Sequence, residues 1–292
     1  FLRRIFLTVS FHFTSGPKNL NYDPILIDNN YLENTMTFSS EVLTIEVNDH
    51  IATLWLDRPE KLNAMSPVVV NDLPLAMAAI GEIDDVRAVI IAAKGRSFCV
   101  GLDLMASSFN QGEDAPSPAI ANIEKLKFTT KFQDAISSVA NCHVPVIAAV
   151  HAHCLGAGID LITACDIRLA SEDATFGVRE TKIGIVADVG TLQRLPGIIS
   201  EGHVAELAYT GKDIGSARAE KIGLINDVYT DADAVYKAAT ELAQEIAANA
   251  PLAVRGTKYI LQQGENLTTE QSLMLNGMWT LMTTFNSNDF KE

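Results

Sequence analysis

Val144-Pro145-Val146-Ile147-Ala148-Ala149-Val150 is a nearly continuous apolar run, and Leu155-Gly156-Ala157-Gly158-Ile159-Asp160-Leu161 follows it closely. Such a run is typical of a strand that is buried on both faces, as in a parallel sheet. The small residues after Leu155 indicate a tight junction that leads into a helix over about Ala157–Cys165. A buried strand joined in this way to a helix is the building unit of an α/β fold.

The sequence on the N-terminal side continues this alternation. Apolar and β-branched runs predict strands over Val42–Val47, Ile51–Leu56 and Val86–Ala93, with the first two joined as a hairpin. Helical patterns cover Ser66–Ile80 and Ala119–Ala140. We therefore expect an α/β body built from strands and helices in alternation.

From about residue 234 the patterns are helical only. The predicted helices are Ala234–Asn249, Pro251–Gln263 and Thr268–Phe285. The chain thus divides into three predicted regions. These are an N-terminal tail at 1–38 outside the fold, a core with the active site at 39–230, and a helical region at 231–292.

The composition is that of a globular protein, with 48% hydrophobic and 20% charged residues. The formal net charge of −14 argues against a nucleic-acid groove, because such a groove needs Lys and Arg to neutralise phosphates. No apolar stretch reaches the roughly 18–20 residues that span a bilayer. The four cysteines lack C-x-x-C spacing and lie in or beside apolar runs, so we expect reduced core thiols of an intracellular protein.

The N-terminal sequence permits two interpretations. It begins at Phe1, is basic and apolar at first, and has no acid before Asp23, which is typical of a targeting presequence. The alternative is an upstream leader with the natural start at Met36, and we favour this one. It predicts a cytoplasmic protein, whereas a presequence at 1–35 would predict a mitochondrial one.

Three carboxylates interrupt apolar or glycine-rich segments, namely Asp160, Glu180 and Asp188. An ionised group in such a segment is costly to bury unless something pairs with it or uses it. Carboxyls held together in one apolar pocket repel each other, so one can donate a proton while another accepts one. The three acids are therefore the candidate catalytic residues.

Each of these acids also has an ordinary interpretation. Asp160 lies where an acidic side chain stabilises the start of a helix. Glu180 and Asp188 can be exposed loop charges that pair with basic residues nearby. Those basic residues are Arg179, Lys182 and Arg194. Only the combination of three acids around a glycine-rich helix start favours a catalytic cluster.

Two glycine-containing segments carry backbone amides that a reaction can use. The helix that begins at Gly156-Ala157-Gly158 has early amides without internal acceptors, which can hold a developing negative oxygen. Gly101 permits a tight turn before Leu102 and Asp103, where Asp103 can cap a following helix. Either signal alone is also explained by close packing of a helix against a strand.

Other chemistry finds less support in the sequence. His151 and His153 alternate along a predicted strand, so they point to opposite faces, and no third ligand cluster is evident; we expect them to be structural. Cys99 has no histidine near it in the sequence and adjoins a buried run, which favours a packing role. The fingerprints of dinucleotide-binding and P-loop folds do not occur. We therefore expect no metal site.

Several motifs in a fixed order carry a family resemblance. They are Leu56-Asp57-Arg58-Pro59-Glu60-Lys61-Leu62-Asn63-Ala64-Met65, Gly95-Arg96-Ser97-Phe98-Cys99-Val100-Gly101-Leu102-Asp103, and 145–168. Through them, residues 39–285 resemble the crotonase (enoyl-CoA hydratase/isomerase) superfamily. The resemblance implies a spiral of ββα turns and a C-terminal helical region that forms a trimer or a dimer of trimers (a hexamer). It also implies an acyl-CoA thioester substrate and no metal or redox cofactor.

Within this superfamily the chain is most similar to the Δ(3,5)-Δ(2,4)-dienoyl-CoA isomerases, through Gly158-Ile159-Asp160-Leu161 and Ala187–Pro196. Hydratases carry a glutamate at the Asp160 position and a glycine at the Asp188 position, and they use two carboxylates to hold one water. A shorter first acid and a new acid deeper along the acyl channel suit proton movement along a conjugated chain. The resemblance implies that Glu180 takes a proton from C2, that Asp188 delivers one at C6, and that Asp160 positions or tunes these acids.

The resemblance also implies binding residues. The backbone N–H groups of Leu102 and Ala157 would hold the thioester oxygen; most relatives have glycine at the latter position, and alanine retains the amide. The residues expected to bind CoA or substrate are Lys61, Asn63, Ala64 and Asp103.

Other functions stay open from the sequence alone. An enoyl-CoA hydratase or a Δ3,Δ2-enoyl-CoA isomerase is the main alternative, and Asp188 is the residue that discriminates against it. A non-catalytic or RNA-binding protein of the same fold is less well supported, because the chain is acidic and retains all three acids. We expect neither a nucleic-acid partner nor a membrane.

Overall fold

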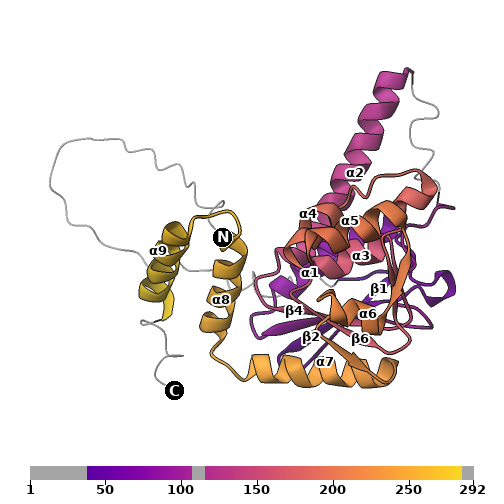
Figure 1. The fold of residues 1–292 in the computed structure, drawn as a ribbon. Helices are drawn as coiled ribbons and strands as arrows, with labels where there is room; N and C mark the ends of the chain where they lie inside the picture. Colours follow the sequence, from indigo (N-terminus) through magenta and orange to yellow (C-terminus); the bar gives the residue numbers. More distant parts are fainter. Residues whose placement is uncertain (1–37, 107–115, 285–292) are drawn as a thin grey trace, which may run out of the picture. The chain divides into compact units, whose positions relative to one another are not determined.

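The computed structural model describes residues 38–106 and 116–284 of the 292-residue chain. Of the tail predicted at 1–38, only the last residue falls in this range. The described residues form nine strands in two sheets, ordered β1-β2-β3-β4-β6-β9 and β5-β7-β8 (Figure 1). The strands are β1 (Leu43–Asn48), β2 (Ile51–Leu56), β3 (Ala88–Ala93), β4 (Val146–Val150), β5 (His153–Leu155), β6 (Ile167–Ser171), β7 (Thr175–Gly177), β8 (Asp213–Gly215) and β9 (Asp227–Tyr229).

The predicted hairpin and the predicted parallel sheet are both confirmed. β1 pairs antiparallel with β2, and the two residues between them, Asp49 and His50, both have positive φ. Positive φ at both positions is what a two-residue hairpin turn requires. β2, β3, β4, β6 and β9 then pair in parallel.

Helices flank and follow the sheets (Figure 1). Three of the longest begin at a capping side chain, because Ser66, Ser117 and Asp231 each accept a hydrogen bond from the backbone N–H three residues ahead. The helices are α1 (Pro67–Gly81), α2 (Pro118–Ala140), α3 (Ala157–Thr163), α4 (Thr191–Arg194), α5 (Glu201–Thr210), α6 (Ser216–Lys221), α7 (Ala232–Ala247), α8 (Pro251–Gly264) and α9 (Thr269–Trp279). A short 3-10 turn, η4 (Glu180–Ile183), lies between β7 and α4.

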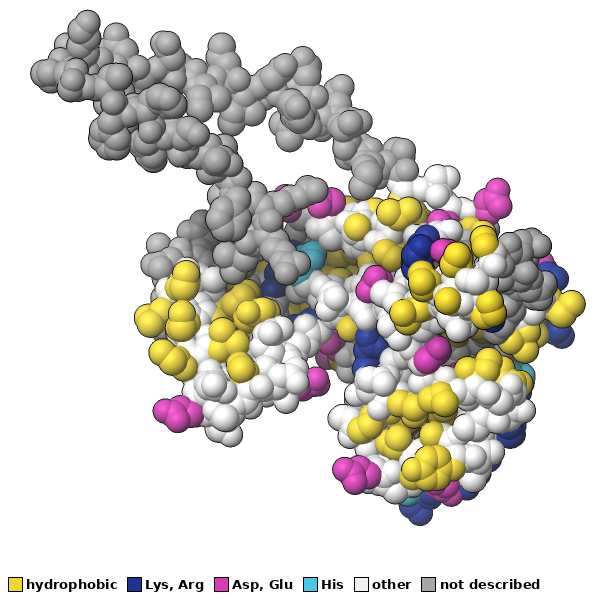
Figure 2. All heavy atoms as spheres, turned by 90° about the horizontal axis from the view of Figure 1, so that it is seen from above, with side chains coloured by type: hydrophobic (Ala, Val, Ile, Leu, Met, Phe, Trp, Pro, Cys, Tyr) yellow, Lys and Arg dark blue, Asp and Glu magenta, His cyan; other side chains and the backbone are white. Residues whose placement is uncertain are grey.

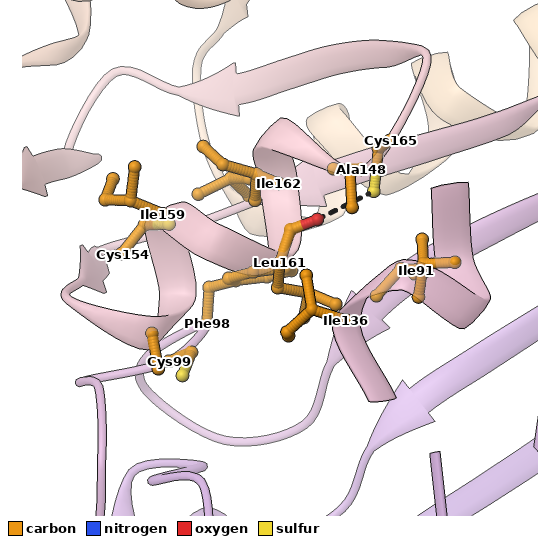
Figure 3. Close-up of a cluster of buried hydrophobic side chains, with 14 of the residues drawn as sticks. Ile91, Phe98, Cys99, Ile136, Ala148, Cys154, Ile159, Leu161, Ile162 and Cys165 are labelled. Carbon is orange, nitrogen blue, oxygen red and sulfur yellow. Dashed lines mark hydrogen bonds between the residues drawn. The ribbon is translucent and has the colours of Figure 1, made fainter. Parts of the chain in front are cut away.

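The two faces of the six-stranded sheet are covered by different helices, because side chains alternate along each strand. Ile90 and Ile147 belong to the face that packs against Ala239 and its neighbours on α7. The other face contributes to the main core with α1, α2 and α3. Figure 3 shows this core around Ile91 of β3, with Ile136 of α2 beside Leu161 of α3.

The chain winds as a spiral of strand-strand-helix turns. One turn runs through β4 of the large sheet, β5 of the small sheet and then α3; the next runs through β6, β7 and η4. An earlier turn has the same plan, since Cys99 follows β3 and pairs in parallel with Cys154 of β5. Equivalent points of successive turns therefore lie next to each other.

The packing corrects the domain boundary expected at 231. α7 belongs to the α/β body, because its buried residues Val235, Ala239 and Ala243 recur every four positions and pack on the sheet. Only α8 and α9 follow the body. The α-helical part of the last predicted helix ends at Trp279 and continues as a π-helical turn over Thr280–Thr284, so its expected last residue lies outside the described range.

A buried cation ties α8 to the body. The Lys258 ammonium donates to the Asp166 carboxylate at 2.7 Å and to the Val144 carbonyl at 2.9 Å. α9 in turn packs on α8, where the rings of Tyr259 and Trp279 stack with centroids 5.2 Å apart. Among the described residues, no helix combines the length and the apolar character needed to cross a membrane.

Candidate active site

A cavity of about 470 Å³ lies among α2, α3 and the segment 179–189. Three carboxylates stand in its wall, Asp160, Glu180 and Asp188, and the rest of the wall is mainly apolar. The apolar lining includes Leu102, Leu104, Phe128, Phe132, Ile185 and Val189. An apolar cavity with a few convergent polar groups is typical of a small-molecule site.

The spiral explains why distant parts of the sequence meet in this wall. In three consecutive turns the chain leaves the small sheet and enters the wall, at Gly101-Leu102 after Cys99, at Gly156-Ala157 after β5, and at Glu180 soon after β7. Because Cys99 pairs with Cys154 and β5 pairs with β7, the segments that follow them are neighbours. The topology thus assembles the site.

Two backbone amides are free in this wall. Within the described residues, neither the Leu102 N–H nor the Ala157 N–H donates a hydrogen bond. The glycines before them have positive φ, +98° at Gly101 and +51° at Gly156. A Cβ at Gly101 would lie 3.7 Å from the Ala157 nitrogen, so the two segments touch. Two unpaired amides in touching segments can hold a developing oxyanion.

Glu180 packs beside these amides. A Cβ at Gly156 would lie 3.2 Å from Glu180 Oε1, which places the carboxylate against the backbone that precedes Ala157. Its Oε2 is buried and has no hydrogen-bond partner among the described residues. Burial raises the pKa of Glu180, and the charge of Asp188 raises it as well. Glu180 therefore has the placement and the raised proton affinity of a general base.

Asp160 is fully buried on α3 and lines the same cavity. Its Oδ1 accepts hydrogen bonds from the Thr191 N–H at 2.5 Å and from the Thr191 hydroxyl at 2.7 Å. Burial raises the pKa of Asp160 to about 7; the hydrogen bonds from Thr191 oppose this rise, and the charge of Glu180 adds to it. A carboxyl with this pKa can hold or release a proton at neutral pH.

Asp188 is an exposed residue of the cavity wall, whereas the sequence predicted a deeper position. Its backbone carbonyl accepts a hydrogen bond from Gln133 of α2 at 2.6 Å, which fixes the segment against that helix. Asp188 and Glu180 line the same cavity, and the charge of Asp188 raises the pKa of Glu180. Two acids in one cavity, at different depths, can serve two different carbons of one ligand.

The sequence matches the enoyl-CoA hydratase/isomerase family over residues 46–292, which is most of the chain. The chain belongs to the enoyl-CoA hydratase/isomerase family. This confirms the family that the sequence motifs predicted.

Two curated relatives in the family are named Δ(3,5)-Δ(2,4)-dienoyl-CoA isomerase. The mitochondrial one of Dictyostelium discoideum is 38% identical over 234 residues, which cover 79% of this chain and 80% of the relative. The peroxisomal one of Arabidopsis thaliana is 36% identical over 241 residues, covering 82% and 87%. The names of both refer to organelles, so the cytoplasmic location that we expected gains no support from them.

A solved structure in the family confirms the predicted fold class. The enoyl-CoA hydratase of Bacillus anthracis aligns with a TM-score of 0.77 at 27% identity, covering 86% of this chain and 93% of the hydratase. The strand-strand-helix spiral described above is thus the fold of this family.

The four residues expected to bind CoA or substrate lie outside the cavity lining. The Asn63 side chain is buried and fully used, because its oxygen accepts from the Arg58 N–H and its amide group donates to the carbonyls of Lys94 and Ser97. These hydrogen bonds give the Asn63 side chain a structural role, and a contact between Asn63 and CoA stays a prediction. For Lys61 and Ala64, CoA binding stays a prediction.

Asp103 also has a structural partner, and its contact with substrate stays a prediction. Its carboxylate accepts from Arg58 at 2.8 Å, and this pairing lowers the pKa of Asp103. Its Oδ1 accepts from the Met105 N–H, but residues 104–106 are not helical and the next described helix, α2, is capped by Ser117, so Asp103 does not cap a helix in the described residues. The Arg58–Asp103 ion pair joins two motifs of the sequence. A second contact between the same motifs is the hydrogen bond from the Met65 N–H to the Gly101 carbonyl at 2.8 Å. Together these contacts hold the segment that carries the Leu102 amide.

Two of the basic residues near the acids, Arg179 and Arg194, form polar contacts with other residues. Arg179 forms an ion pair with Asp213 rather than with Glu180. Arg194 donates to the Ser137 hydroxyl at 2.9 Å, and its charge acts on the buried Asp160. Glu180 thus lacks an ion pair among the described residues.

Sequence reasoning missed three contributors to the site. Phe128 and Phe132 of α2 line the cavity. Their spacing of four residues in the sequence indicates that they lie on the same face of the helix. Thr191 binds Asp160 from a segment thirty-one positions later, and nothing in the local sequence announces that contact.

His151, His153 and Cys99, which the sequence offers as candidates for chemistry, have structural surroundings. His151 bonds with the Gly95 carbonyl at 3.0 Å and His153 with the Ser97 hydroxyl at 3.3 Å. Cys99 is buried, and burial raises its pKa to about 12, which makes it a poor nucleophile. In residues 38–106 and 116–284, no group of three His, Cys, Asp or Glu side chains is placed to hold a metal ion.

Proposed function

We propose that this protein is a Δ(3,5)-Δ(2,4)-dienoyl-CoA isomerase, which converts 3,5-dienoyl-CoA into 2,4-dienoyl-CoA in fatty acid β-oxidation. One observation carries the proposal: two acids, Glu180 and Asp188, share an apolar cavity with the free Leu102 and Ala157 amides. The relatives named for this reaction support it. A hydratase needs both carboxylates on one water, which is a different arrangement.

The first step is removal of a proton from C2. The Leu102 and Ala157 amides bind the thioester oxygen, so the electron pair left by the proton is stabilised as an enolate. Glu180 takes the proton, and its raised pKa suits this task. Each amide donor can contribute on the order of 3 kcal/mol to the stability of the transition state.

The second step delivers a proton to C6. The electron pair moves along the diene, so double bonds form at C2–C3 and C4–C5 as those at C3–C4 and C5–C6 are lost. Asp188 gives its proton to C6 and Glu180 keeps the one from C2, so the number of protons on the ligand is unchanged.

Asp160 completes the proposed machinery without touching a reacting carbon. Its charge state changes near pH 7 and acts on Glu180 beside it. The reaction moves protons and double bonds within one molecule, and neither oxidation nor a Lewis acid is needed for the balance. We therefore propose that coenzyme A enters as part of the substrate and that the enzyme uses no metal or redox cofactor.

Ultraviolet spectroscopy tests this function directly. The purified protein is mixed with 3,5-octadienoyl-CoA, and formation of the conjugated 2,4-dienoyl chromophore is followed over time. Crotonyl-CoA in a parallel reaction measures hydration. The proposal predicts rapid isomerisation with little hydration, and the reverse result would assign the protein as a hydratase.

Assembly and location are further parts of the proposal. We infer a homotrimer or a hexamer, because α8 and α9 expose a group of large apolar side chains. We also infer that the protein works in a mitochondrion or a peroxisome, which is supported by the names of its relatives. Residues 1–37, which would carry an N-terminal presequence, lie outside the described range.

A further inference from the structure

The two oxygens of the Asp160 carboxylate have very different surroundings. Oδ1 accepts both the N–H and the hydroxyl of Thr191, at 2.5 and 2.7 Å. Oδ2 is buried and has no hydrogen-bond partner among the described residues. Thr191 is itself fully buried, so water does not compete for its hydroxyl. Rotation of the carboxyl away from this orientation would break both hydrogen bonds.

The backbone around Thr191 is built for this contact. Thr191 is the first residue of α4, so its N–H has no acceptor within the helix. The preceding Gly190 has a φ of +135°, which a residue with a side chain rarely adopts. At the far end of α4, Arg194 is fixed to Ser137 of α2. The short helix is thus fixed at Arg194, and Thr191 at its first position donates hydrogen bonds to the Asp160 carboxylate.

We propose that Thr191 is a positioning residue, whose hydroxyl locks the Asp160 carboxyl so that Oδ2 alone remains for proton exchange in the cavity. This inference rests on the proposed function and deepens it. In this scheme α4 holds the buried Asp160 carboxyl in one orientation and sets its proton affinity. Thr191 itself does not contact the substrate in this scheme.

The charged and titratable groups around Asp160 set the direction of the expected effect. Glu180 raises its pKa and Arg194 lowers it, while the buried thiols of Cys99 and Cys154 face it and feel its charge. The hydrogen bonds from Thr191 stabilise the ionised form and so lower the pKa. Loss of the Thr191 hydroxyl should therefore raise the pKa of Asp160 above about 7.

Three variants separate positioning from general stability. Thr191→Val keeps the size and the backbone N–H of Thr191 but removes the hydroxyl, and Thr191→Ser restores it. Thr163→Val is the matched control, because the buried Thr163 hydroxyl donates to the backbone carbonyl of Asp160 at 3.0 Å and not to its carboxyl. If Thr191→Val does not fold, the smaller Thr191→Ala removes the same hydroxyl.

Kinetics and infrared spectroscopy give two independent readouts. For Thr191→Val we expect kcat to fall roughly tenfold with little change in KM, and the pH profile to shift upward by about one unit, as one lost hydrogen bond to an ionised group predicts. Thr191→Ser should return both towards the parent values. Thr163→Val should lower thermal stability without moving the pH profile. If Thr191→Val behaves like Thr163→Val, Thr191 is merely structural and the inference is wrong.

The infrared measurement does not depend on activity. The band of the protonated Asp160 carboxyl is assigned by its loss in Asp160→Asn and is then titrated in the parent protein and in Thr191→Val. A higher titration midpoint in Thr191→Val supports the role of Thr191 even if the parent fails to isomerise dienoyl-CoA. An unchanged midpoint would overturn the inference even if the parent is an active isomerase.

Discussion

At Gly156 the backbone lies close to the carboxylate of the proposed base, Glu180. The Gly156 φ of +51° and ψ of −119° suit glycine, and a Cβ there would meet Glu180 Oε1 at 3.2 Å. Gly156→Ala should therefore lower the free energy of unfolding by roughly 1–3 kcal/mol through backbone strain. It should also reduce kcat, because Glu180 must move. Chemical denaturation and the ultraviolet assay measure the two effects.

Gly202 offers a matched control for that substitution. It lies in α5, and a Cβ there would meet nothing within 4 Å. Gly202→Ala should leave activity unchanged and stabilise the protein by about 0.5–1 kcal/mol, because alanine restricts the unfolded chain. A Gly156→Ala variant as stable and active as Gly202→Ala would contradict the described geometry.

Asp160 makes folding stability depend on pH. Its pKa rises from 3.8 to about 7 on folding, so between these values the folded state binds more protons than the unfolded state. Stability therefore falls as the pH rises through this window. Asp160→Asn removes the ionisation and keeps an acceptor for Thr191. We expect this variant to be more stable than the parent at pH 8 by roughly 1–3 kcal/mol, with a much smaller difference at pH 5.

Thermal unfolding at both pH values measures this prediction. Because Asp160→Asn and the parent are compared at the same pH, the contributions of other titrating groups to stability cancel. A stability difference that is equal at pH 5 and pH 8 would show that Asp160 folds with an ordinary pKa.

At the scale of elements, the strands β1 to β4 and the long helices were predictable from the sequence to within a few residues, whereas the short strands β5 to β9 were not predicted. Periodicity and caps define them locally, as for Ser66 at the start of α1 and Ser117 at the start of α2. The three acids of the site were predictable too, because ionised groups stand out in apolar segments. Their membership of one cavity is consistent with that reasoning.

What escaped prediction depends on contacts between elements. Asp103 looked available, but Arg58 reaches it from a loop forty-five positions earlier. Helix α7 was predicted to belong to the C-terminal region, yet its buried residues Val235, Ala239 and Ala243 pack on one face of the six-stranded sheet. Such contacts follow from the spiral and leave no local signal, which is why Thr191 was also missed.

The contact of α8 with α9 depends on another glycine. A Cβ at Gly256 would lie 2.1 Å from Trp279 Nε1, which belongs to a ring stacked on Tyr259. Gly256→Ala should therefore destabilise this helix pair by about 1–3 kcal/mol, as overpacking does. Gly277→Ala on α9 is the control, because a Cβ there meets nothing within 4 Å. Hydrogen exchange should show faster exchange of α9 amides in Gly256→Ala only, and equal exchange in both would refute the packing.

At the scale of the whole molecule, the C-terminal helices indicate assembly. Leu261, Leu273, Met274 and Met278 are at least half exposed, and Figure 2 shows hydrophobic side chains gathered over this part of the molecule at the left of the view. Exposed apolar groups of this kind mark interaction surfaces. We predict a trimer or a hexamer in analytical ultracentrifugation.

A charge on that surface should weaken the assembly. Leu273→Asp is expected to shift the protein towards smaller species, whereas Leu75→Asp on α1, where the leucine is also exposed, should not. A monomeric parent protein, or equal effects of the two substitutions, would contradict the assignment of the surface.

The central claim is that Glu180 and Asp188 act on different carbons of one substrate, and deuterium exchange tests it most directly. The parent protein, Glu180→Gln and Asp188→Asn are incubated with 3,5-octadienoyl-CoA in D2O, and the label is located by NMR. We predict that Asp188→Asn still exchanges the C2 protons but loses isomerisation at least about 100-fold, the effect of removing a general acid. Glu180→Gln should lose both. Isomerisation by Asp188→Asn at the parent rate, or C2 exchange by Glu180→Gln at the parent rate, would contradict the account.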